Sequence, residues 1–262
     1  MRSLDKIRFV VIGMPRTGST LLATGLEQHP NVTCFGELIH PLESERKKVE
    51  SIVVDGENAC FDPERDDAIE FLRTCVYENP TLVSRAVGFK LHGHFAAGRG
   101  SHDLLARLRG EIPDLRFIHI KRENYLDVYL SLAIACRDMK WSIFASEGNG
   151  QNKSELKRVE PISIQFQEAE KYFFEMNNMD SLFYRLFSGV NYFCVNYADL
   201  DRFYEREMSK IYEFLGVESH VARPWVVKQN TSTARDLIMN YDELSERFSN
   251  TFFSRFFKEA LD

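Results

Sequence analysis

The feature that most constrains this chain is a short apolar run, Ile7 to Ile12, that leads directly into a glycine-rich turn. Its β-branched residues predict a buried strand of a parallel sheet. The turn covers Gly13 to Gly18, and Ser19 to Gln28 has the composition and spacing of a helix. A strand, a tight turn and a helix in this order allow backbone N–H groups and the helix N-terminus to hold an anion. These residues therefore predict an anion-binding loop.

Strand and helix patterns alternate along the rest of the chain. We predict strands at 32–35, 87–91, 115–120 and 192–196, and helices at 63–77, 124–137, 163–187 and 200–215, with a phenylalanine-rich helical segment at 248–257. Asn124 is expected to cap one of these helices and Gly216 to stop another. The alternation predicts an α/β fold with a parallel sheet flanked by helices on both faces. Since no linker or repeat divides the sequence, we predict a single domain over residues 1–262.

The glycine-rich turn has the spacing of a phosphate-binding loop, G-x-x-x-x-G-K-[ST], with one difference. Ser19 stands where that pattern has lysine, and the cation comes earlier, as Arg16. An arginine side chain is planar and can hold an anion through two parallel hydrogen bonds. The alternative is a strand–helix turn that binds nothing. The strand, the helix start and Arg16 together favour the anion site.

Two cations, Lys121 and Arg122, follow the apolar strand at 115–120. Phosphoryl transfer uses Mg²⁺, which is usually held by an acidic residue at such a strand end. The basic pair therefore predicts a second anion site and no metal site there, with an ordinary solvated strand end as the alternative. Elsewhere, His92 and His94 could share Zn²⁺ from one side of a strand. His102 is near in sequence, but no third ligand is implied, so we expect no metal.

Composition limits the partners and the compartment. The chain of 262 residues has 33 lysines and arginines against 39 aspartates and glutamates, so its formal net charge is −6. A net-acidic surface does not suit nucleic acid, and no apolar segment reaches the roughly 18 residues of a membrane span. The run from Ile7 is too short for a signal peptide. Five dispersed cysteines without a CxxC pair predict a protein of the reducing cytoplasm.

Five stretches in order resemble a known family: 14–20 (MPRTGST), 29–38 (HPNV and GEL), 88–91 (GFKL), 119–141 (HIKR with Ser131 and Trp141) and 196–200 (NYADL). They resemble the sulfotransferases that use 3′-phosphoadenosine 5′-phosphosulfate (PAPS), above all the bacterial carbohydrate enzymes of the nodulation-factor and trehalose type. The tail at 228–257 is also similar, so the resemblance covers nearly the whole chain. It implies the P-loop-like, three-layer α/β fold of that family.

The resemblance also implies roles in nucleotide binding. The 5′-phosphosulfate would be bound by Arg16, Thr17, Gly18, Ser19 and Thr20. Arg122 and Ser131 would bind the 3′-phosphate, and Tyr197 would lie near the adenine. Lys228 lies in a late loop that could fold over the nucleotide, although simple solvation is the default for a loop lysine. Two anion groups on one nucleotide match the two anion sites inferred from the residues alone.

The general base that would deprotonate the acceptor has two candidates. Glu37, 21 residues after Arg16, matches the acceptor-side glutamate of the bacterial enzymes. His92 follows Lys90 in a Lys-x-His pattern that resembles the catalytic histidine of the animal cytosolic enzymes. We prefer Glu37, because the overall likeness is to the bacterial group. Lys90 would contact the transferring sulfuryl group or the bridging oxygen, or else form a salt bridge at a strand end.

The predicted function is transfer of a sulfuryl group from PAPS to a hydroxyl of a carbohydrate, glycolipid or related small acceptor. The alternatives are a small-molecule kinase and a non-catalytic nucleotide-binding module. The missing loop lysine and acidic strand end count against a kinase, and the joint presence of the candidate site residues counts against a module. Residues 41–62 and 142–159 are polar and expected to contact the acceptor. A homodimer is implied only by the family resemblance.

Overall fold

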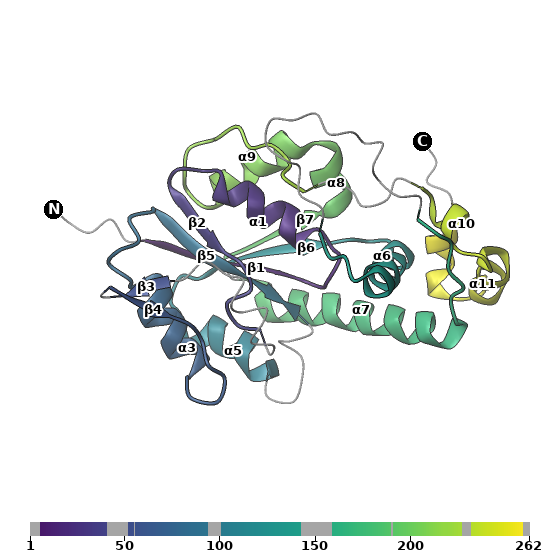
Figure 1. The fold of residues 1–262 in the computed structure, drawn as a ribbon, viewed down its shortest axis with the longest axis horizontal. Coiled ribbons are helices and arrows are strands. Elements are labelled where there is room, and N and C mark those ends of the chain that lie inside the picture. Colours follow the sequence, from purple (N-terminus) through teal and green to yellow (C-terminus); the bar gives the residue numbers. More distant parts are fainter. Residues whose placement is uncertain are drawn as a thin grey trace. The chain divides into compact units, whose positions relative to one another are not determined.

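The computed structural model describes residues 6–40, 52–54, 56–93, 101–142, 159–189, 191–226 and 232–258, without the side chains of 101–103. The chain divides into two compact units (Figure 1). One comprises 1–121 with 182–224, and the other comprises 122–181 with 225–262. The single domain expected over residues 1–262 stays a prediction.

The first unit is built on a five-stranded parallel sheet with strand order β2-β5-β1-β6-β7. Its strands are β1 (Ile7–Gly13), β2 (Val32–Phe35), β5 (Ala86–His92), β6 (Arg116–Lys121) and β7 (Tyr192–Asn196). The central strand β1 is covered on both faces, and its residues 9–12 have no exposed surface. Val11 pairs with Lys90 on one side and with Ile118 on the other. A strand enclosed in this way must be continuously apolar, as residues 7–12 are.

Helices cover both faces of this sheet (Figure 1). One face carries α1 (Ser19–Glu27), α8 (Tyr197–Arg202) and α9 (Tyr204–Phe214). The opposite face carries α3 (Ala68–Phe71) with the π-helical turn η1 (Leu72–Tyr77), α5 (Ser101–Glu111) and the C-terminal end of α7 (Phe166–Phe187). On that face the ring of Phe187 stacks on Phe117 of β6 at 4.0 Å. The predicted three-layer α/β architecture is confirmed.

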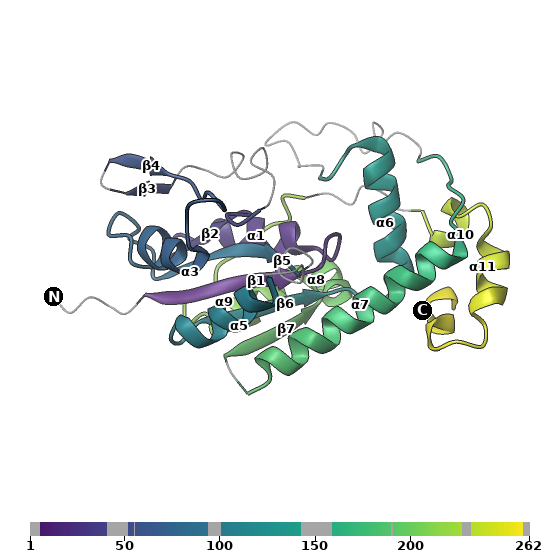
Figure 2. The ribbon, with the colours of Figure 1, turned by 90° about the horizontal axis from the view of Figure 1, so that it is seen from below.

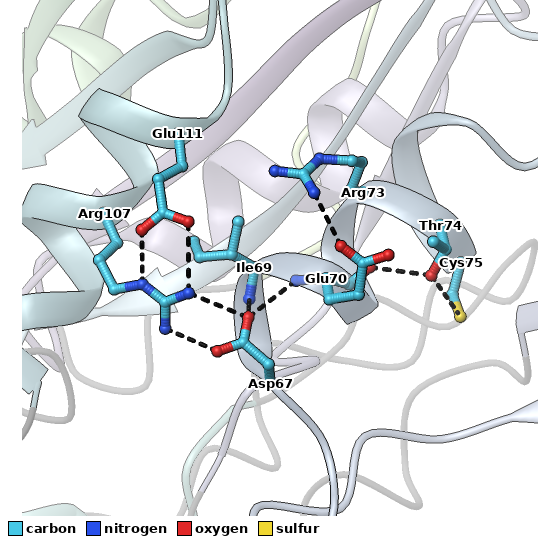
Figure 3. A network of polar contacts seen from close by, with 8 residues as sticks. All are labelled: Asp67, Ile69, Glu70, Arg73, Thr74, Cys75, Arg107 and Glu111. Atoms are coloured by element: carbon cyan, nitrogen blue, oxygen red, sulfur yellow. Dashed lines mark hydrogen bonds and ion pairs between the residues drawn. The ribbon is translucent and has the colours of Figure 1, made fainter.

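An exposed polar network connects α3 with α5 (Figure 3). The Asp67 carboxylate caps α3 by accepting hydrogen bonds from the backbone N–H groups of Ile69 and Glu70, both at 3.0 Å. The same carboxylate accepts two hydrogen bonds from Arg107 of α5, at 2.8 and 3.0 Å, and these lower the pKa of Asp67 to about 2. Arg107 also pairs with Glu111 at 2.6 Å. Exposed pairs contribute at most about 1 kcal/mol each, so the network mainly orients the two helices.

The second unit is helical and has an aromatic core. It comprises α6 (Tyr125–Asp138), most of α7, α10 (Ala234–Leu237), α11 (Tyr241–Phe248) and the 3₁₀ turn η3 (Phe252–Phe257), all visible in Figure 2. Phe173 of α7 has no exposed surface, and its ring lies within 5.2 to 5.4 Å of Phe248, Phe253 and Phe256. The predicted cap Asn124 is confirmed, because its side chain accepts hydrogen bonds from the first turn of α6.

Several predicted boundaries are wrong for local reasons. The helix expected over 63–77 begins at Ala68, since Asp67 supplies the cap, and the one expected over 163–187 begins at Phe166. The helix expected over 200–215 begins earlier and divides at Phe203. The hairpin of β3 (Ile52–Val54) and β4 (Glu57–Ala59) and the helices α5 and α10 were not predicted.

Other expectations concern segments that are only partly described. Within 142–159, residues 143–158 lie outside the described residues. Of 41–62, the residues 41–51 and 55 do as well. Among the helices that are described, none is both long and apolar enough to cross a membrane.

The close packing of β5 against β1 yields a stability prediction. A Cβ atom at Gly88 would meet the carbonyl oxygen and ring of Phe9 closer than real Cβ atoms approach. Gly88→Ala is therefore expected to lower the free energy of unfolding by about 1–3 kcal/mol, as overpacking does in closed cores. Gly110→Ala, in the exposed part of α5 where nothing lies within 4 Å, is the matched control. It should raise that free energy by roughly 0.5–1 kcal/mol, because alanine favours helix. Urea unfolding of both variants measures the difference, and equal effects would contradict the packing described.

Candidate active site

The loop that joins β1 to α1 is tight and partly buried. Thr17 is 1% exposed, and its Oγ1 donates to the carbonyl oxygen of Met14 at 2.7 Å. Arg16 adopts a φ of 67° and Gly18 a φ of 98°, both in the left-handed region that non-glycine residues rarely occupy. Gly18 is the N-cap of α1 and brings no side-chain acceptor to its first turn. The first-turn N–H groups are therefore suited to an anion placed at the loop.

Close approach to β6 and α8 explains the two glycines of the loop. A Cβ atom at Gly13 would lie 2.8 Å from the carbonyl oxygen of Ile120 at the end of β6. At Gly18, a Cβ atom would overlap the ring of Tyr197, the first residue of α8. Tyr197, predicted near the adenine, therefore packs directly on the anion-binding loop. A loop fixed on two sides holds its backbone donors in place before a ligand arrives.

Beside the loop, a buried polar cluster surrounds the carboxylate of Glu37. Its Oε1 lies 2.8 Å from Nζ of Lys90 and 3.1 Å from Nε2 of His92. Its Oε2 lies 3.5 Å from Nε2 of His40. Lys90 also donates to Oγ1 of Thr20, at 3.2 Å. Lys90 thus connects the predicted base to the first turn of α1, which follows the predicted anion-binding loop.

The parallel sheet explains how these side chains meet. β2 and β5 are neighbours, so the carboxyl ends of both strands lie at one edge of the sheet. Lys90 and His92 are two residues apart on β5 and therefore face the same side. Glu37 comes two residues after β2, and the backbone N–H of Lys90 donates to the carbonyl oxygen of Gly36 at 3.2 Å. A carboxylate, an ammonium group and an imidazole therefore lie at the carboxyl ends of the strands. This is the edge at which parallel α/β sheets bind ligands.

Burial and the neighbouring groups set the charges of this cluster. Burial by itself raises the pKa of the Glu37 carboxyl, but the hydrogen bond with His92 and the charge of Lys90 outweigh it and hold that pKa well below its usual range. Burial lowers the pKa of His92, and the contact with Glu37 offsets this only in part. At neutral pH the site therefore combines an ionised carboxylate with a neutral imidazole. Nε2 of this imidazole faces the carboxylate, 3.1 Å from Oε1 of Glu37.

This arrangement has two chemical capacities. The Glu37 carboxylate can accept a proton from a hydroxyl placed at the edge of the sheet. The Lys90 ammonium lies between that carboxylate and the anion-binding loop, where it can stabilise negative charge that develops on a bound anion. With a side chain only 9% exposed, Lys90 acts in an environment where screening by water is weak.

The other predicted residues lie in the first unit, in the second unit or outside the described residues. Ser19, at the start of α1, is buried, and Lys121 ends β6 in register with Asn196. Arg122 and Ser131 belong to the second unit, where Nη2 of Arg122 lies 3.2 Å from Oδ2 of Asp127. Lys228 and His94 lie outside the described residues, as does the side chain of His102.

His119 and His40 were not among the predicted site residues. His119, part of one of the five family-like stretches, is buried beside Tyr192, with Nδ1 2.7 Å from the hydroxyl. Burial lowers the pKa of His119 to about 3, so this core side chain is uncharged at neutral pH. His40 was not predicted, and its only signal in the sequence is its place three residues after Glu37.

In the part of the chain that the structure describes, no three His, Cys, Asp or Glu side chains are placed to hold a metal ion.

Comparisons with known proteins agree on one family. A model of the sulfotransferase family matches residues 8–221. Nodulation protein H of Rhizobium tropici is 25% identical over 257 residues, which cover 95% of this chain and 92% of that protein. Nodulation protein H of Rhizobium meliloti strain 1021 is 25% identical over 256 residues, which cover 97% and 96%.

Solved structures show the same fold. A sulfotransferase from Alicyclobacillus acidocaldarius is similar with a TM-score of 0.51 and 16% identity, covering 93% of this chain and 92% of that one. The sulfotransferase domain from the curacin biosynthetic pathway has a TM-score of 0.50 and 13% identity, covering 96% of each chain. At such low identity these likenesses show the fold alone.

The Glu37–Lys90 pair yields a prediction about stability and pH. Lys90→Met leaves a carboxylate without its cation, which costs about 3–5 kcal/mol when the pair is fully buried. Because the Glu37 side chain is 23% exposed, a smaller loss of about 2–3 kcal/mol is expected. The double variant Glu37→Gln with Lys90→Met should recover at least about 1 kcal/mol of it. Urea unfolding of the wild type, the two single variants and the double variant gives the four free energies of unfolding. Purely additive effects of the two substitutions would contradict a direct pair.

The pH dependence has a definite sign. The folded-state pKa of Glu37 is depressed, so the pair stabilises the fold above the ordinary glutamate pKa of about 4.3 and loses this contribution as the pH falls further. The loss caused by Lys90→Met should therefore be largest near neutral pH and shrink in acid. The same unfolding series measured from neutral to acidic pH checks this trend.

Proposed function

This chain belongs to the sulfotransferase family and is a sulfotransferase, and we propose that it transfers a sulfuryl group from PAPS to a hydroxyl of a carbohydrate, glycolipid or related small acceptor. The observation that carries the proposal is the position of Lys90, which pairs with Glu37 and donates a hydrogen bond to Thr20 in the first turn of α1, directly after the anion-binding loop. The base and the loop that would hold the donor are thus parts of one hydrogen-bonded unit. The carbohydrate class of acceptor is supported by the resemblance to the nodulation-factor type of enzyme.

The residues of the loop fit the phosphosulfate end of PAPS. Arg16, Thr17, Gly18, Ser19 and Thr20 would bind it through the guanidinium, the hydroxyls and the first-turn N–H groups of α1. The loop glycines support this assignment, since both positions are too crowded for a Cβ atom. Tyr197, packed on Gly18, would lie near the adenine. Arg122 and Ser131 for the 3′-phosphate, and Lys228 over the nucleotide, rest on the family resemblance.

The proposed reaction is an in-line displacement at sulfur. The oxygen of the acceptor hydroxyl forms a bond to sulfur while the bond from sulfur to the bridging oxygen of the 5′-phosphate breaks. That oxygen keeps the electron pair and leaves as part of 3′,5′-ADP, and the hydroxyl proton passes to Glu37. Arg16, Lys90 and the N-terminus of α1 would neutralise the charge that grows on the leaving oxygen.

The contact between the two candidate bases favours Glu37. In the resting site the His92 imidazole is neutral and its Nε2 lies 3.1 Å from the Glu37 carboxylate. His92 would then orient the carboxylate, and the carboxylate is the group with a lone pair to accept the proton. Lys90 holds that carboxylate ionised, although a pKa so far below neutral makes Glu37 a weak base until the donor is bound.

The donor site is tested by calorimetry without metal. 3′,5′-ADP is expected to bind in the presence of EDTA, and Arg16→Asn should weaken it roughly 10- to 100-fold, the value of one or two charge-assisted hydrogen bonds. Asparagine is chosen for this substitution because it tolerates a left-handed backbone and carries no charge. A protein that prefers Mg-ATP to 3′,5′-ADP would contradict the proposed donor.

The base is tested by paired substitutions. Glu37→Gln keeps the shape of the side chain but removes the base, and should lower kcat by about 10²- to 10⁴-fold. His92→Gln keeps an amide donor near the carboxylate and should cost less. Transfer from labelled PAPS to an acceptor found by screening gives kcat, and calorimetry with 3′,5′-ADP serves as the control for donor binding. Full turnover by Glu37→Gln would show that Glu37 is not the base.

The predicted compartment and assembly follow from the sequence alone. The cytoplasm is favoured by the dispersed cysteines, and a homodimer by the family resemblance. Both remain proposals.

A further inference from the structure

We propose that His40 is a positioning residue that fixes the Glu37 carboxylate so that Oε2, and not Oε1, receives the proton of the acceptor. The inference rests on the proposed function and names a residue that neither the sequence motifs nor the family comparison singled out. It comes from the unequal surroundings of the two carboxylate oxygens.

The oxygen Oε1 is fully engaged in the resting site. It lies 2.8 Å from Nζ of Lys90 and 3.1 Å from Nε2 of His92. Both of these side chains come from β5 and approach the same carboxylate oxygen. Among the described residues, Oε2 is approached by His40 alone, at 3.5 Å. One lone pair of Oε2 therefore remains for a hydroxyl of the acceptor.

The segment after β2 holds His40 in place. The side chain of His40 is only 8% exposed, although it follows Glu37 by three residues in a stretch without regular structure. Leu38 between them is 6% exposed, and its N–H donates to the carbonyl oxygen of Gly36 at 3.0 Å. An imidazole is buried at a cost unless its nitrogens meet polar partners. The chain thus brings a buried ring to Oε2 of the carboxylate, whereas the two contacts from β5 are with Oε1.

The expected effect is on orientation. The terminal torsion angle of a glutamate has a broad and roughly two-fold distribution. Contacts on one oxygen alone therefore leave the carboxylate able to rotate about this torsion. A contact on each oxygen fixes its plane. Misplacing a catalytic group by about 1 Å can cost on the order of 10²-fold in rate, and this loss falls on kcat because the donor is bound elsewhere. Among the residues that the structure describes, the charged and titratable groups that face Glu37 are Lys90 and His92 from β5 and His40 from its own segment.

Two amide variants separate positioning from packing. The side-chain amide of glutamine reaches about as far as Nε2 of histidine, whereas that of asparagine reaches about as far as Nδ1. His40→Gln should therefore keep kcat within about 3-fold of the wild type. His40→Asn should lower kcat about 10- to 100-fold with the KM for PAPS changed less than about 3-fold. Equal kcat values for the two variants, whether both normal or both low, would overturn the proposal.

A second measurement does not depend on the fit of either amide. If His40 acts through Glu37, His40→Asn should have no further effect on the residual kcat of Glu37→Gln. A loss of the same factor in both backgrounds would overturn the proposal. The control for burial of a histidine is His29→Gln, because His29 is 3% exposed and its Nε2 lies 2.8 Å from the carbonyl oxygen of Glu218. This control should lower Tm and leave kcat unchanged.

The outcomes also distinguish this inference from the proposed function. A wild-type protein that binds 3′,5′-ADP and transfers sulfuryl groups, with His40→Asn as active as His40→Gln, retains the function and loses the role of His40. A wild-type protein that transfers nothing from PAPS to any hydroxyl acceptor removes the function on which the inference rests.

Discussion

The ion pair between Lys90 and Glu37 is the interaction on which the site depends. Taking a carboxylate and an ammonium out of water costs several kcal/mol for each ion, and attraction between them recovers this only with good geometry and further hydrogen bonds. Both conditions hold, since the pair is 2.8 Å apart and each partner has another polar contact, Lys90 with Thr20 and Glu37 with His92. A chain built for stability alone would fill this edge with apolar side chains. The retained charges are better explained by chemistry than by folding.

The strand order distributes this chemistry across one edge of the sheet. β2 ends before Glu37, β5 carries Lys90, β1 leads into the loop that ends at Gly18, and β6 ends with Lys121. Neighbouring strands lie about 4.8 Å apart. The order β2-β5-β1-β6 therefore sets a predicted base, a bridging cation, an anion-binding loop and a further cation side by side. In the proposed reaction the proton would pass to Glu37 and the leaving group would stay at the loop, and Lys90 contacts Glu37 and the first turn of α1 after that loop.

The sequence predicted the buried parts of this fold better than its surface. The strand expected at 7–12 is confirmed as β1, because a parallel strand covered on both faces must be a continuous apolar run. The strands at 32–35 and 192–196 also agree to the residue, although they lie at the two edges of the sheet and are only partly buried. The hairpin of β3 and β4 was missed because its strands are three residues long and one reads Glu-Asn-Ala. For the site, Glu37 and His92 were predicted as rival bases. Only the pairing of β2 with β5, which sequence order does not specify, shows them in contact. His40 was missed because a single histidine outside any motif carries no signal.

The left-handed backbone at Arg16 has a consequence for the evolution of this loop. A non-glycine residue at a φ of 67° costs about 1–2 kcal/mol relative to glycine, and asparagine would also be tolerated there. A change of Arg16 to glycine or asparagine would therefore be expected to raise the free energy of unfolding. Under the proposed function, the guanidinium of Arg16 binds the donor, and this role would account for the cost to stability. A thermostabilised descendant of this protein would be prone to lose its activity at this residue first.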